Sequence, residues 1–212
     1  MDELQRRKTI ETVGKRAIAV LGLVLTTSWA GYSADAPIIR QGVTETGGFV
    51  GASYGVDKAR VMGGGNIVYS LTKVFMPYGE VSYFPGIVRS YSATGATYTA
   101  DIPLTDLNFG FHLRVPIPKS RVIPYGVIGF GLLHAGSGTE TETRILPGVS
   151  QPKITPGLPR PASTDYTTSF GGGLRYYATE RWGFRVEAKG YKPQGVYKDV
   201  FYRVTGGFFY QF

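Results

Sequence analysis

The chain has 212 residues, including 30 glycines, 15 tyrosines and 12 phenylalanines, and it contains no cysteine. Its length fits one domain, or one domain that follows a processed leader. The lack of cysteine excludes disulfide frameworks, thiol catalysis and cysteine-ligated metals, and the composition favours strands and tight turns over a helical bundle.

The first thirty residues have the composition of an export signal. Five basic residues precede an apolar run from Ala17 to Leu25, and small residues follow up to Ala30. This order is typical of a secretory signal peptide, and the run is shorter than the roughly 20 residues that a membrane-spanning helix needs. We predict a signal peptide over 1–30, an N-terminal extension over 31–46 and a barrel domain over 47–212. Cleavage after Ser33 remains an alternative to cleavage after Ala30.

The charge of the chain is positive but dispersed. The net charge is +8, and removing the leader leaves 18 basic and 12 acidic residues, a net charge of +6. No basic cluster indicates nucleic-acid binding, so we predict no nucleic-acid partner, whereas anionic lipid headgroups are compatible with this balance.

The remainder divides into eight segments with alternating apolar and polar residues, namely 47–56, 64–71, 76–84, 106–117, 122–133, 167–178, 182–191 and 200–212. The segment 106–117 alternates most regularly, with Leu107 and Phe109 on one face and Asp106 and His112 on the other. A period of two predicts a strand, since a helix would scatter these residues around its circumference. The segment 122–133 is apolar on both faces, which leaves open a bulge that shifts its phase.

The connections between these segments alternate in length. Residues 72–75, 118–121 and 179–181 form short connections, and residues 57–63, 85–105, 134–166 and 192–199 form long ones. This alternation is typical of an up-and-down barrel with short periplasmic turns and long external loops. The longest connection contains Pro147, Pro152, Pro156, Pro159 and Pro161. We expect these prolines to prevent sheet pairing and to keep the segment extended.

The placement of charge predicts which face of each strand points outward. The faces opposite the aromatic ones carry nearly all the ionisable residues, namely Glu80, Asp106, His112, Arg114, Arg175, Arg185, Glu187, Lys189 and Arg203. If the apolar faces met water, each strand would expose several large apolar residues, far more than a soluble surface tolerates. A lipid-facing apolar side with a charged lumen removes this difficulty, and a closed barrel satisfies every backbone amide in lipid.

The last strand adds a further indication. Tyr202, Val204, Phe208, Tyr210 and Phe212 share one face, and the chain ends on Phe212. Two strands also open with the motif Pro-Tyr-Gly, at 77–79 and 124–126. With the leader and the glycine-rich strand ends, these features resemble the OmpA/OmpX-type family of eight-stranded outer-membrane barrels over 47–212.

The resemblance implies an outer-membrane location, contact with outer-membrane lipid and lipopolysaccharide, and insertion by the barrel-assembly machinery. That machinery would read the closing strand, with Phe208, Tyr210 and Phe212 as its insertion signal. The resemblance does not imply one activity, because such barrels serve as anchors, adhesins and lipid enzymes. Because the predicted barrel reaches Phe212, we expect no peptidoglycan-binding domain of the kind that full-length OmpA carries.

Several groups offer possible chemistry. The charged lumen favours a mutually satisfied ion network over a conduction path, because eight strands enclose a bore just wide enough for their own side chains. The two histidines, His112 and His134, lack a recognisable catalytic arrangement, although Ser137 follows His134 closely. Glu140 and Glu142 suit a solvated strand extension better than a cation site, and Gly63-Gly64-Gly65-Asn66 suits a turn better than a phosphate loop.

We therefore predict an all-β, eight-stranded, antiparallel up-and-down transmembrane barrel behind a cleavable signal peptide. The predicted function is a structural anchor with a plugged lumen, no cofactor, no metal and no enzymatic activity. Its external loops would mediate interactions, and Tyr91, Tyr98, Tyr166 and Tyr197 are equally suited to contact a ligand or to pack one loop on another. A narrow small-solute porin is the alternative, and a lipid-modifying enzyme is the third reading.

Overall fold

The computed structural model describes residues 39–55, 59–118, 120–145, 151–195 and 198–212. The predicted signal peptide and both cleavage sites lie outside these residues. Within the described chain, no helix is long and apolar enough to cross a membrane. The strands are β1 (Thr44–Tyr54), β2 (Ala59–Tyr69), β3 (Phe75–Ala93), β4 (Ala96–Arg114), β5 (Val122–Ala135), β6 (Gly138–Arg144), β7 (Lys153–Arg160), β8 (Ser163–Tyr177), β9 (Trp182–Pro193) and β10 (Phe201–Gln211).

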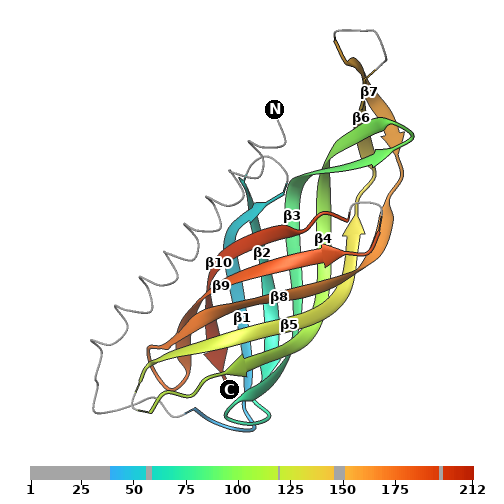
Figure 1. The fold of residues 1–212 in the computed structure, drawn as a ribbon. Coiled ribbons are helices and arrows are strands. Elements are labelled where there is room, and N and C mark those ends of the chain that lie inside the picture. The colour runs from blue at the N-terminus through green and yellow to red at the C-terminus, as the bar shows by residue number, and fades with distance from the viewer. Residues whose placement is uncertain (1–38, 56–58, 119, 146–150, 196–197) are drawn as a thin grey trace.

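Eight of these strands form a closed antiparallel barrel. β1 pairs with both β2 and β10, β3 pairs with both β2 and β4, and β5, β8 and β9 complete the ring. Strands that are neighbours in the ring are also consecutive along the chain, apart from the inserted β6 and β7 and the closing pair of β1 with β10 (Figure 1). The predicted eight-stranded up-and-down barrel is confirmed.

Side chains alternate between the lumen and the outer surface along each strand. On β4, Leu107, Phe109 and Phe111 are 38–46% exposed, whereas Asp106 and His112 are completely buried. β5 keeps an unbroken register with β4 and with β8, so the bulge that its sequence left open is absent from this strand. Its two apolar faces have different neighbours: Ile123 faces the lumen, and Phe130 faces outward.

Two segments that we expected to be loops are paired strands. β3 and β4 continue beyond the barrel wall to a tight turn in which Thr94 and Gly95 have positive φ angles of 48° and 74°. Residues 134–166 contain the end of β5, the β6–β7 hairpin and the start of β8. β6 pairs with the upper part of β4, so β3, β4, β6 and β7 form a sheet that projects away from the C-terminal end of the barrel (Figure 1). We call this sheet the lobe.

The expectation that proline would prevent pairing in this region is wrong. Pro156 and Pro159 lie within β7, and Pro159 pairs with Thr139 of β6. β7 is an edge strand, because β6 is its only partner among the described strands. A proline is tolerated there because the N–H it lacks is not needed where no further strand pairs. Pro147 lies outside the described residues.

A bulge changes the phase of β3 where this strand enters the lobe. Phe84 pairs with Leu104, but the next pair is Ile87 with Ile102, so Pro85 and Gly86 together oppose one residue of β4. Even-numbered residues of β3 face the lumen below this point, and Ile87 and Arg89 are buried above it. The extra residue therefore changes the inward positions of β3 from even-numbered to odd-numbered, while Ile87 and Arg89 still pair with the inward residues Ile102 and Ala100 of β4.

The interior of the upper barrel is mainly apolar, although it also holds buried Arg89, whose guanidinium lies 5.0 Å from the ring centroid of Phe201. A buried cluster there consists of Phe49, Met62, Phe84, Ile87, Ala100, Ile102, Leu104, Leu133, Ala135, Tyr191 and Phe201. The rings of Phe84 and Phe201 pack edge to face with centroids 5.6 Å apart, and Tyr191 stacks on Phe201 at 4.9 Å. We call this cluster the upper cap. The prediction of a lumen filled by ionic side chains thus needs correction for this part of the barrel.

Candidate functional site

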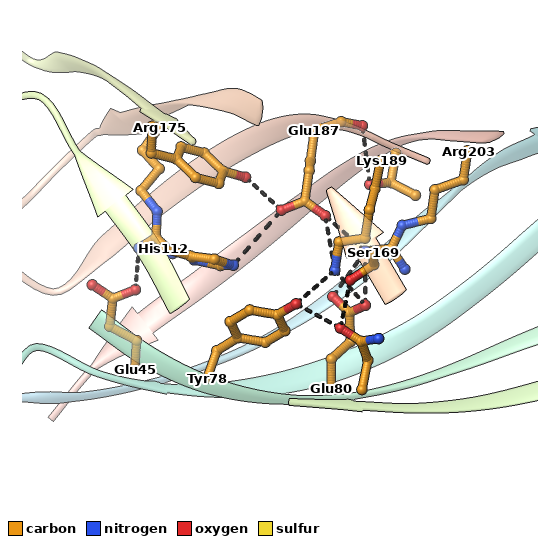
Figure 2. A network of polar contacts seen from close by, with 12 residues as sticks. Glu45, Tyr78, Glu80, His112, Ser169, Arg175, Glu187, Lys189 and Arg203 are labelled. Carbon is orange, nitrogen blue, oxygen red and sulfur yellow. Dashed lines mark hydrogen bonds and ion pairs between the residues drawn. The ribbon is translucent and has the colours of Figure 1, made fainter. Parts of the chain in front are cut away.

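Two acidic and two basic residues form the centre of the lumen. Glu80 lies 3.0 Å from Lys189 Nζ and 2.8 Å from Arg203 Nη2. Glu187 lies 2.7 Å from the same arginine nitrogen and 3.6 Å from Lys189 Nζ. Each acid thus contacts both bases, and all four side chains are at least 98% buried. Figure 2 shows this quartet, which joins β3, β9 and β10 across the bore.

Hydrogen bonds tie the quartet to uncharged side chains on other strands. Tyr125 donates its hydroxyl proton to Glu187 at 2.8 Å, and Arg203 donates to the hydroxyl of Ser82 at 2.7 Å. The amide oxygen of Asn108 accepts from Tyr78 at 2.6 Å and from Ser169 at 2.9 Å. Lys189 donates to the hydroxyl of Tyr78 at 3.4 Å, so β4, β5 and β8 all belong to the same network.

His112 lies between the two tyrosines of the Pro-Tyr-Gly motifs. Its ring centroid is 4.5 Å from that of Tyr78 and 4.9 Å from that of Tyr125. Arg175 donates to His112 Nδ1 at 2.9 Å and forms an ion pair with Glu45, which also accepts from Gln211 at 2.7 Å. The repeated motif therefore supplies two rings that hold one imidazole in the middle of the lumen.

Three other predicted lumen residues have separate surroundings. Arg114 donates to the hydroxyl of Tyr177 at 3.0 Å and to the carbonyl of Thr72 at 3.1 Å, near the short turns. Arg185 places its guanidinium 5.3 Å from the ring centroid of Phe49. Asp106 is completely buried, yet neither carboxylate oxygen has a hydrogen-bond partner among the described residues.

The structure places all nine residues predicted for the lumen inside the barrel, but it adds partners that the sequence analysis missed. Glu45 was assigned to the N-terminal extension, although it continues the inward phase of β1. Tyr78 and Tyr125 were noticed as a motif but not as lumen residues. Their positions in the alternating pattern, with Glu80 two residues after Tyr78, were the signal that could have identified them.

The lower end of the lumen is closed by an apolar cluster. Ile123, Tyr177 and Phe209 are almost completely buried there, and Ile39 packs against them. Tyr177 and Phe209 meet edge to face with centroids 5.3 Å apart. We call this cluster the lower cap. The ionic network therefore lies between two apolar clusters, and Arg114 and Arg175 connect it to Tyr177 and Phe209 of the lower cap.

The residues considered for catalysis or metal binding are dispersed. His134 lies on the outward face of β5, and its Nδ1 is 2.9 Å from the hydroxyl of Thr164. His112 is enclosed within the lumen network. Among the described residues, no group of three or more acidic or histidine side chains is arranged to hold a metal ion. Gly63 to Asn66 lie inside β2, so the expectation that they form a turn is wrong.

The lobe carries tyrosines and acidic residues. Tyr91 stacks on Tyr98 with ring centroids 5.0 Å apart, and it donates to Glu140 at 3.2 Å. Partial burial and the neighbouring Glu140 carboxylate raise the pKa of Tyr91. Glu142 pairs with Arg144 at 2.6 Å. Thr139 to Thr143 form a strand extension, as predicted, whereas Tyr197 lies outside the described residues.

The outer surface of the barrel has a continuous uncharged band. Among the described residues, outward positions carry no charged side chain over 46–54, 61–69, 75–83, 105–113, 122–132, 166–176, 182–190 and 202–212. Tyr69, Tyr176 and Trp182 lie at its short-turn end, and Tyr54 and Tyr202 lie at its opposite end. Two aromatic girdles around an apolar band are the surface of a transmembrane β-barrel.

The closing strand has the predicted orientation. Phe208 and Phe212 are 50% and 69% exposed, Tyr210 is partly exposed, and all three lie on the outer face. Phe209 and Gln211 face inward. The three residues proposed as an insertion signal thus form part of the apolar band.

Comparison with known proteins identified structural similarity but no match to a family model and no match among curated sequences. The N-terminal β-barrel domain of Pseudomonas aeruginosa OprF is 18% identical, with a TM-score of 0.48, covering 81% of this chain and 98% of that domain. Yersinia pestis Ail, in complex with the heparin analogue sucrose octasulfate, is 13% identical, with a TM-score of 0.47 and coverages of 82% and 100%. Neisserial surface protein A is 12% identical, with a TM-score of 0.48 and coverages of 80% and 96%.

Proposed function

We propose that this protein is an integral protein of the bacterial outer membrane, in which a sealed barrel anchors a surface-exposed interaction lobe. The observation that carries the proposal is the uncharged outer band around a charged, closed lumen. A charge near the middle of such a band would cost roughly 2–4 kcal/mol, so its absence throughout fits a surface solvated by acyl chains.

Membrane fractionation and gel migration test the anchor. We expect the protein in the outer-membrane fraction, and we expect its band to shift on boiling because the closed barrel resists unfolding by detergent at room temperature. A purified chain that is monodisperse in buffer without detergent would refute the proposal, because the outer band would then have to be compatible with water.

The layered lumen supports a plug rather than a pore. The quartet of Glu80, Glu187, Lys189 and Arg203 fills the middle of the bore, and an apolar cap lies on either side. An ion that crossed this path would have to displace both caps and a buried ion network. In planar bilayers we expect no stepwise openings above background. Regular conductance steps would favour the alternative, a narrow porin.

The lobe supports the proposed surface role. It extends beyond the barrel at the end opposite the C-terminus, and its exposed face carries tyrosine, threonine and acidic side chains. Trypsin added to intact cells tests its exposure. We expect cleavage at Arg144 and Lys153, which are exposed at the far end of the β6–β7 hairpin, with the barrel remaining in the membrane. Cleavage only after the outer membrane is broken would place the lobe on the periplasmic side.

A further inference from the structure

The outer band is interrupted by a groove over the strands that close the barrel. One hollow of about 370 Å³ is lined by Thr46, Gly47, Gly48, Trp182, Phe208 and Tyr210. A second, of about 530 Å³, continues from it along Gly48 and Phe208 towards Val50, Gly63, Phe184 and Gly206. The two hollows share Gly48 and Phe208, and together they form one shallow groove, open to the membrane side, which crosses β9, β10, β1 and β2.

The walls of the groove are aromatic and its floor is bare backbone. Trp182 and Tyr210 pack with ring centroids 4.8 Å apart, and Trp182 and Phe208 lie 6.3 Å apart. Within the described chain, no charged residue lines either hollow. Such a surface suits a flexible hydrocarbon chain, because it offers contact area without polar groups that would need partners.

The packing of the barrel does not require a glycine at position 206 in the floor of the groove. A Cβ atom added to Gly206 would meet no heavy atom within 4 Å. A Cβ atom added to its inward-facing neighbour Gly207 would lie 2.5 Å from the carbonyl oxygen of Gly48. Glycine is therefore required at 207 by the close approach of β1, whereas at 206 a larger side chain would simply fill the groove.

A basic side chain lies at the short-turn end of the groove. Arg181 lies in the turn between β8 and β9, is exposed, and places Nη1 3.5 Å from the hydroxyl of Tyr210. Among the described residues no carboxylate pairs with it, whereas the neighbouring Glu180 pairs with Arg40. This position is at the short-turn end of the band, where the headgroups of the periplasmic leaflet would lie. An arginine there complements the charge of a phosphate.

We propose that the groove binds one phospholipid molecule of the periplasmic leaflet, with an acyl chain between Trp182, Phe208 and Val50 and its phosphate at Arg181. This inference rests on the proposed membrane insertion. A ligand made only of hydrocarbon fits this site less well than a phospholipid, because Arg181 would then contribute nothing to binding. It also predicts that a second copy of the chain does not cover this face.

Trp182 provides a direct reporter. The chain has two tryptophans, and Trp29 lies in the predicted signal peptide. Trp29→Phe removes it from any unprocessed chain, so that Trp182 is the single tryptophan that fluoresces. We would refold this variant in mild detergent and titrate it with phosphatidylglycerol brominated on its acyl chains, which quenches tryptophan on contact. Diacylglycerol with the same brominated chains serves as the probe without a phosphate. We expect the phospholipid to quench Trp182 saturably at one molecule per chain, and more tightly than the diacylglycerol.

Three variants separate the groove from the rest of the outer band. Gly206→Leu, which fills the floor, should weaken phospholipid binding by about tenfold or more. Gly126→Leu is the matched control: Gly126 also faces outward, on β5, and an added Cβ there meets nothing within 4 Å. It should leave the binding unchanged. Arg181→Gln should reduce the affinity for the phospholipid to that for the diacylglycerol.

Several outcomes would overturn the proposal. Quenching that rises without saturation, equally in the Gly206→Leu and Gly126→Leu variants, would show ordinary partitioning into the micelle. Dimers that exclude the probe would show that a second copy covers the groove. Failure of the proposed membrane role would look different, because Trp182 would then escape quenching even after reconstitution into bilayers made wholly of brominated lipid.

Discussion

The middle and the upper part of the same barrel have opposite polarities. In the middle, Phe109 and Val186 face outward while Glu80 and Arg203 face the lumen. In the upper part, Asp101 and Lys192 face outward while Phe84 and Phe201 are buried inside. The wall is continuous, so the environment rather than the strand geometry explains the difference. The middle is built for lipid outside, and the upper part has the ordinary polarity of a protein in water.

This comparison predicts that the middle depends on complete ion pairing. Replacing Glu187 with leucine leaves Lys189 and Arg203 with only Glu80, and we expect the free energy of unfolding to fall by about 3–5 kcal/mol. Urea titration of the refolded protein in lipid vesicles measures the change. The double variant Glu187→Leu with Lys189→Met restores the charge balance and should recover part of the loss. Equal stability of the single variant and the wild type would show that the quartet is solvated.

The upper cap should respond as an ordinary hydrophobic core does. Phe84 is fully buried and packs against Tyr191 and Phe201, so Phe84→Ala should lower the free energy of unfolding by roughly 3–4 kcal/mol. Phe84→Leu keeps most of the volume and is the control, with a smaller expected loss. If both variants match the wild type, the cap does not contribute to stability.

The free-energy cost of an outward-facing arginine should differ between the middle and the upper border of the barrel. Val186→Arg places a cation in the apolar band of β9 and should cost roughly 2–4 kcal/mol in vesicles. Thr105→Arg places the same group at the upper border of the band on β4 and should cost about 1 kcal/mol or less. Equal costs would contradict the change of environment along the barrel.

The smallest effect is expected at Asp106. Its carboxylate is completely buried and has no hydrogen-bond partner within the described chain, while the nearby quartet already contains two acids and two bases. Asp106→Asn keeps the shape and removes the acid, so we expect no loss and a gain of about 1 kcal/mol in the free energy of unfolding. A large loss in the same urea titration would show that the carboxylate stabilises the network in its ionised form.

The sequence predicted the barrel because its main signal is local. Alternation along 106–117 and 182–191 needs only the period of a strand, and the position of the charges on one face fixes which side meets lipid. The contacts within the lumen could not be predicted in the same way. Whether Glu80 meets Lys189 or another base depends on the register and tilt of strands more than one hundred residues apart in the chain.

The upper part was missed for two physical reasons. Ile102 and Leu104 face inward on the part of β4 that extends past the membrane. The sequence between 85 and 105 nevertheless lacks the apolar outer face by which a membrane strand is recognised. The β6–β7 hairpin was missed because proline is expected to prevent pairing, a rule that fails at the edge of a sheet.

The bulge at Pro85 and Gly86 keeps the inner side of β3 continuous from the barrel into the lobe. Ile87 and Arg89 lie opposite Ile102 and Ala100, which face inward on β4. Deleting one of the two bulged residues would keep these pairs, so Ile87 and Arg89 would stay buried and only the local distortion of β3 would disappear. The length of β3 can therefore change by one residue at this point without exposing the side chains of the upper cap.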